Sequence, residues 1–143
     1  MGFFSDLFKK GEDPEASCFD EVLGEMNWSE DDEAWAGQFN GHEFVLAYEY
    51  ESKPIGPLVV YARQVMGDPA WLEATLFEAK KKAEDYYGKQ YMSEISSLRF
   101  GVIHFSCGKH GLRIIADLEG GLADRCWRIE YADMNCEGIG FDR

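Results

Sequence analysis

Histidine and cysteine side chains are the groups in this chain that could bind a metal or attack a substrate. Cys107 and His110 have the spacing of two zinc ligands, but a zinc site needs about four ligands and no second close pair exists. A cysteine nucleophile needs a base within hydrogen-bond reach. Cys126 opposite His104 across neighbouring strands would supply one, although no local motif supports the pair. No glycine-rich phosphate-binding motif is present.

We therefore predict no metal, no cofactor and no enzyme activity. The alternative is a small enzyme or ligand-binding domain with its site on the sheet face near His104, Cys126 and Arg128.

Charge is distributed unevenly along the 143 residues. There are 27 acidic and 14 basic residues, which gives a net charge of -13. The first 50 residues hold 13 of the acids and two bases, Lys9 and Lys10. A nucleic-acid binder needs a basic footprint and an anionic membrane attracts cations, so this charge argues against both partners.

The densest acidic run lies beside a tryptophan. An aromatic anchor surrounded by carboxylates is a common way to bind a basic protein. The plainer interpretation is that the run is solvated and keeps the protein soluble. On the first interpretation, the residues that contact a basic protein partner are Trp28, Glu30, Asp31, Asp32 and Glu33.

Two apolar patterns near the start of the chain predict helices. The spacing i, i+3, i+4, i+7 of Phe19, Val22, Leu23 and Met26 predicts one with an acidic outer face, so residues 1–33 are expected to form an acidic helical extension. A second, shorter helix is expected to dock on its own domain or to form a homo-oligomer, with a membrane-surface role less favoured. Its apolar face consists of Phe3, Phe4, Leu7 and Phe8.

The start lacks the pattern of a secretory signal, so we expect a cytoplasmic protein.

Period-2 alternation predicts a hairpin over 34–39 and 43–50, joined by a type I′ turn at Asn40-Gly41. This turn pairs Gly37 with Phe44, whose ring can cover the bare glycine. Helical spacing follows at 58–66, where a strand remains an alternative, and at 69–88, which Asp68 and Pro69 open. Strands are then expected at 98–107, with a bulge at Gly101, at 112–118 and at 126–131, with a short edge strand at 139–141.

Strands and helices follow one another here without β-α-β alternation, which indicates the α+β class. We expect a single domain over 1–143. Its antiparallel sheet would have five or six strands, from the hairpin and the C-terminal meander, with two or three helices packed on one face.

The layout also resembles a group of small bacterial proteins of unknown function. The residues that carry this resemblance are Trp35-Ala36-Gly37 in the hairpin, the connector from Pro54 to Pro57, the pair Trp71-Leu72, and the meander from Leu98 to Tyr131. Some proteins of this type resemble immunity proteins that accompany secreted antibacterial toxins. The resemblance covers about residues 34 to 131 and implies a non-enzymatic inhibitor.

Together with the acidic surface, the resemblance predicts an immunity protein that blocks a basic toxin directed at nucleic acid or nucleotides. The remaining alternative is a homo-oligomeric structural protein.

Overall fold

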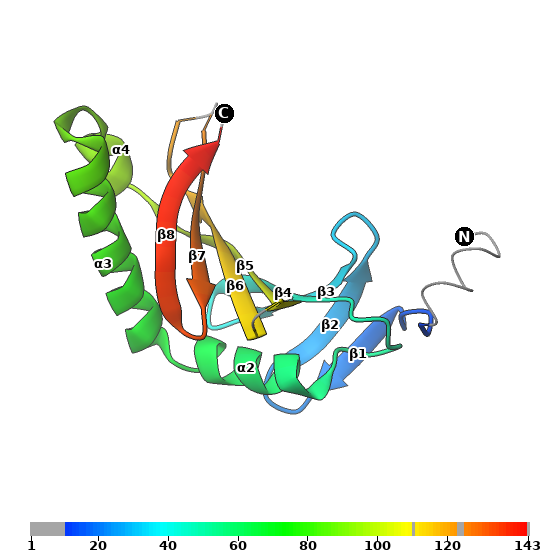
Figure 1. Ribbon diagram of the computed structural model, residues 1–143. Helices are drawn as coiled ribbons and strands as arrows, with labels where there is room; N and C mark the ends of the chain where they lie inside the picture. Colours follow the sequence, from blue (N-terminus) through cyan, green and yellow to red (C-terminus); the bar gives the residue numbers. More distant parts are fainter. Residues whose placement is uncertain (1–10, 110, 123–124, 143) are drawn as a thin grey trace.

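The computed structural model describes residues 11–109, 111–122 and 125–142, and it confirms the α+β class (Figure 1). Eight strands form one sheet in chain order, with every neighbouring pair antiparallel except β4 and β5, which are parallel. The strands are β1 (Ser17–Asp20), β2 (Gly24–Ser29), β3 (Ala34–Phe39), β4 (His42–Ala47), β5 (Arg99–Gly108), β6 (Gly111–Glu119), β7 (Cys126–Ala132) and β8 (Asn135–Asp142). Between β4 and β5 lie α2 (Gly56–Met66), α3 (Pro69–Tyr87), the short 3-10 helix η1 (Lys89–Tyr91) and α4 (Met92–Ser96).

The expected helix in the acidic N-terminal segment is wrong, because residues 17–29 form the hairpin of β1 and β2. The carboxylate of Asp20 accepts hydrogen bonds from the backbone amides of Val22 and Leu23, and this local bonding turns the chain. Gly24 then adopts a φ of +83°, which glycine tolerates and a helix excludes. These two added strands, with a full-length β8, raise the count from the expected five or six to eight. The parallel β4–β5 pair makes the sheet mixed instead of antiparallel.

The predicted hairpin is confirmed in position and register. Phe39 pairs with His42 across the turn, and Gly37 pairs with Phe44. Asn40 and Gly41 have φ angles of +51° and +79°, as a type I′ turn requires. A Cβ atom added to Gly37 would lie 2.8 Å from Cζ of Phe44, so only glycine leaves room for this ring.

The helices pack on one face of the sheet and bury its inward-facing side chains. From α2 and α3 the buried residues include Leu58, Val65 and Leu72, and they meet an aromatic layer from the strands. That layer contains Trp35, Phe44, Phe105, Trp127 and Tyr131. The residues that alternate with these in each strand therefore lie on the opposite, open face.

Local signals position the remaining elements. Asp68 caps α3 by accepting a hydrogen bond from the amide of Trp71 at 3.0 Å, and Pro69 opens the helix. The β5–β6 register shifts between Phe100 and Ile103, which confirms the bulge expected at Gly101. Within the described ranges, no helix has the length and apolar character needed to cross a membrane.

Candidate functional site

The five residues predicted to bind a partner lie around the turn between β2 and β3, but the structure divides them. The side chains of Glu30, Asp31, Asp32 and Glu33 are exposed. Trp28 is half-buried, with its ring 5.1 Å from that of Trp35 and 5.6 Å from that of Tyr48. The Trp28 ring therefore packs with the core tryptophan and is only partly exposed, and its role as an anchor for a partner stays a prediction.

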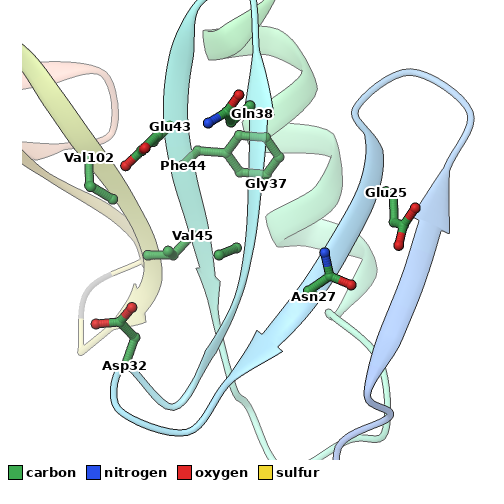
Figure 2. A pocket seen from close by; sticks show the side chains of 10 residues that line it. Glu25, Asn27, Asp32, Gly37, Gln38, Glu43, Phe44, Val45 and Val102 are labelled. Atoms are coloured by element: carbon green, nitrogen blue, oxygen red, sulfur yellow. The ribbon is translucent and has the colours of Figure 1, made fainter.

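A hollow of about 520 Å³ opens where β2 and β3 separate (Figure 2). The two strands pair from Ser29–Ala34 to Asn27–Ala36 and no further. Beyond that point the first half of β2 stays paired with β1, while the second half of β3 stays paired with β4. The sheet thus splits into two hairpins, and the split leaves the hollow between them.

Carboxylates surround this hollow. Glu25 comes from β2, Asp32 from the β2–β3 turn and Glu43 from β4, as Figure 2 shows. The side-chain amides of Asn27 and Gln38 add hydrogen-bonding groups, while the apolar part of the lining comes from Ala36, Phe44, Val45 and Val102. Such a surface suits a cationic side chain with an apolar stem, such as lysine or arginine.

An exposed aromatic residue lies on the neighbouring strand. Phe19 of β1 is 76% exposed and pairs with Glu25, so both side chains lie on the open face. Phe19 lines a second hollow of about 590 Å³, together with Glu25, Glu15 and Lys53. The exposed aromatic among carboxylates is thus Phe19 and not Trp28. The signal that could have identified it is Gly24, which argues for a hairpin and places Phe19 on the outer face of a strand.

We call the part of the sheet formed by β1 to β4, with its flanking acids, the acidic wing. Between residues 11 and 79 the only basic side chains are Lys53 and Arg63. Arg63 of α2 is held by Asp20, through Nη2 to Oδ1 at 2.5 Å and Nε to Oδ2 at 3.0 Å. These hydrogen bonds lower the pKa of Asp20 to about 2, with the Val22 and Leu23 amides contributing and burial opposing the shift.

The rest of the sheet neutralises its charges internally. Four ion pairs, together with the hydrogen bond between His104 and Asp117, lie in this part of the chain: Arg99–Glu119, Arg113–Glu130, Arg125–Glu94 and Arg128–Asp142. In the described part of the acidic wing, the ion pairs present are those of Arg63 with Asp20 and Glu21. The carboxylates around the hollow therefore have no basic partner among the described residues.

The alternative site on the sheet face does not come together as predicted. His104 lies on the open face, 2.9 Å from Asp117, while Arg128 is bound to Asp142 at 3.0 Å. Because β6 lies between β5 and β7, Cys126 is not on a strand next to His104. Cys126 also precedes Arg128 by two residues, and Arg128 is the residue opposite Asp117 in the β6–β7 register, so Cys126 lies further along the sheet. The pair lacks the contact that a nucleophile and its base need.

A buried ion pair attaches α4 to the meander, and the sequence contains no obvious signal for it. Glu94 is 8% exposed and accepts hydrogen bonds from Nε1 of Trp127 at 2.6 Å and from the amide of Leu122 at 3.1 Å. Arg125 completes the pair, and its guanidinium lies over the neighbouring rings of Tyr91 and Phe141. Burial alone would raise the pKa of Glu94, but these hydrogen bonds and the Arg125 charge lower it.

Two further predictions concern metals and self-association. Across the described ranges, no three histidine, cysteine or acidic side chains lie close enough together to hold a metal ion. Phe3, Phe4, Leu7 and Phe8, the residues predicted to mediate a homo-oligomer, lie outside the described residues.

Comparison with known proteins leaves the site to be interpreted from its own geometry. No family model, no curated protein and no solved structure matches this chain.

Proposed function

We propose that the protein is a non-enzymatic binding module whose acidic wing receives a basic protein. The observation that carries this proposal is the contrast in charge between the two parts of the sheet. Among the described residues, the carboxylates around the hollow form no ion pair, whereas ion pairs link the strands of the other part. Unneutralised like charge destabilises a folded protein, and a cationic surface that approaches it relieves the repulsion.

The contact region has an aromatic centre and an acidic rim. Phe19 offers an apolar side chain beside Glu25, and the hollow adds Asp32 and Glu43. Aromatic side chains contribute most of the affinity in many interfaces, and surrounding charges raise the rate and selectivity of association. The exposed run of Glu30, Asp31 and Glu33 extends the same negative field.

The partner class that fits best is a basic toxin that acts on nucleic acid or nucleotides. The active site of such a toxin must attract phosphates, so it presents lysine and arginine side chains. The carboxylates of the acidic wing can occupy that site in place of the phosphates. The role of an immunity protein, which the layout of the chain suggests, follows from this competition.

Replacing four acids of the run tests the proposal. The binding partner is first captured from the producing cells at low salt, and its affinity and association rate are then measured by surface plasmon resonance. Changing Glu30, Asp31, Asp32 and Glu33 to Ser is expected to weaken binding at least about tenfold, mainly through slower association. Raising the salt concentration should weaken wild-type binding in the same way.

A matched control removes the same charge elsewhere. Glu73, Glu78, Asp85 and Glu137 are exposed and lie outside the acidic wing. Changing these four to Ser should alter binding much less. Salt-independent binding that the first variant leaves intact, or an equal loss in both variants, would contradict the proposal.

A further inference from the structure

Strand β1 forms one edge of the sheet, and its hydrogen bonds show which peptide groups point outward. The amide of Trp28 in β2 donates to the carbonyl of Ala16 at 2.9 Å, so the peptide groups of Ala16 point toward β2. Peptide groups alternate in direction along a strand, so those of Glu15, Ser17 and Phe19 point away from the sheet.

Among the described residues, another segment of the chain covers only the first of these positions. The amide of Glu15 donates to the carbonyl of Ser52 at 2.8 Å, so the connector after β4 lies beside the chain here. The connector then leads into α2 at Gly56. In the described part of the chain, no hydrogen bond from another segment reaches the outward peptide groups of Ser17 and Phe19.

The opposite edge of the sheet has a helix beside it. Helix α3 runs beside β8 (Figure 1), and a Cβ atom on Gly140 would lie 3.3 Å from the hydroxyl of Tyr87. Natural edge strands are usually blocked by lysine, proline or a bulge. β1 has the sequence Ser-Cys-Phe-Asp and pairs with β2 without a register shift. Its protective features are its short length and the inward-pointing Asp20.

The charges beside this edge select its occupant. On the open face, Phe19 lies with Glu25, and Glu15 lines the same hollow. Lys53 lines the hollow as well, but Arg63 is already bound to Asp20. A second copy of this edge would bring like charges together, whereas lysine or arginine side chains on an added strand would meet the carboxylates.

We propose that the basic partner supplies an extended segment that adds to the sheet beside β1. The segment exchanges backbone hydrogen bonds with Ser17 and Phe19, places an apolar or β-branched side chain against the Phe19 ring, and places lysine or arginine toward Glu15 and Glu25. This inference rests on the proposed function, because it names the form in which the basic partner binds.

Two peptides of equal charge separate strand addition from simple charge attraction. The first reads KTKTVTKT and can form a strand; the second has proline in place of each threonine, which removes those amide donors and opposes pairing. Fluorescence anisotropy of labelled peptides is measured on the full chain at low salt. Strand addition predicts at least about tenfold tighter binding of the threonine peptide, with new protection of the Ser17 and Phe19 amides in NMR hydrogen exchange.

A matched pair of variants tests the edge itself. Ser17→Pro removes an outward amide that the sheet does not use, and Ser17→Ala removes the same hydroxyl but keeps the amide. The preference for the threonine peptide should disappear in Ser17→Pro and persist in Ser17→Ala. Folding of both variants is checked by near-UV circular dichroism, and the exchange measurement on the wild type supplies the result if Ser17→Pro fails to fold.

The outcomes distinguish this inference from the proposed function. Equal binding of both peptides would overturn strand addition and leave the charge-based proposal standing. Absence of binding by either peptide would overturn strand addition by a basic segment. Protection of the Ser17 and Phe19 amides already in the free protein would also overturn it, because the chain's own first residues or a second copy would then occupy the edge. Removing residues 1–10 and diluting the sample distinguish these two occupants.

Discussion

Removing the charge of Asp20 should measure how firmly the acidic wing is held to the helices. Its side chain is 9% exposed and joins the β1–β2 turn to Arg63 of α2. The pKa of this carboxyl is about 2 in the folded protein, against an ordinary value of 3.8. Linkage converts that difference into about 2.5 kcal/mol of folding free energy at neutral pH. We therefore expect Asp20→Asn to lower the free energy of unfolding by about 2–3 kcal/mol at pH 7.

The pH dependence of this loss identifies its cause. A lowered folded-state pKa stabilises the protein fully above the unfolded-state pKa, and the stabilisation is lost as the pH falls through the folded-state pKa. The gap between wild type and Asp20→Asn should thus be complete at pH 7, about half as large at pH 3 and nearly closed at pH 2. Urea unfolding followed by tryptophan fluorescence measures the gap at each pH.

A neighbouring carboxylate provides the control. Glu21 lies 4.0 Å from Arg63 but its side chain is 83% exposed, so Glu21→Gln should change stability by less than about 0.5 kcal/mol. The difference in free energy of unfolding between wild type and Asp20→Asn could instead be equally large at pH 3 and pH 7. That result would refute the electrostatic explanation, because it would show that the shape of the Asp20 side chain, and not its charge, stabilises the turn.

Two further substitutions test packing and the buried ion pair. Gly37→Ala should lower the free energy of unfolding by about 1–3 kcal/mol because the new methyl group would meet the ring of Phe44. Gly138→Ala is the control, since a Cβ atom at that position has open space, and it should lower the free energy of unfolding much less. Thermal unfolding of both variants measures the difference. In the wild-type protein, Nε1 of Trp127 donates a hydrogen bond to the carboxylate of Glu94. Glu94→Gln should therefore lower the melting temperature and shift the fluorescence of Trp127. Unchanged fluorescence would contradict the assigned hydrogen bond.

The sequence predicts best where one local signal agrees with another. At the β3–β4 hairpin, the Asn40-Gly41 turn and the alternation of apolar residues require the same register, and both are observed. The long helix α3 is similarly specified by the Asp68 cap and by Gly88, which follows its last residue. No local signal specifies the β4–β5 pair, because its partners are distant in the chain.

The N-terminal segment shows how helical spacing can mislead. Leu23 and Met26 are buried, as an apolar stripe predicts, but Phe19 and Val22 are exposed. The same four positions fit a hairpin in which the buried and exposed residues fall on opposite sides. The polar turn at Asp20 and the positive φ of Gly24 favour the hairpin over the helix. In this segment they therefore predict the backbone better than the spacing of the apolar residues does.

The sequence predicts the exposure of the acidic run but not the packing of Trp28. The exposure of Glu30 to Glu33 follows from their solvation cost. The packing of Trp28 on Tyr48 could not be inferred, because β4 brings that ring from a separate strand. The hollow likewise depends on the point at which β2 leaves β3, which no residue type marks.

The single parallel pairing in the sheet has a consequence for the order of folding. Strands β1 to β4 form one series of short hairpins and β5 to β8 form another, so each series can assemble from contacts close in sequence. The seam between them joins Leu46 to Phe105 and closes a loop that contains all the described helices. Closing a long loop costs entropy before its contacts form. We expect this seam to be the slowest step on the route to the native state, with the two halves of the sheet becoming ordered before they join.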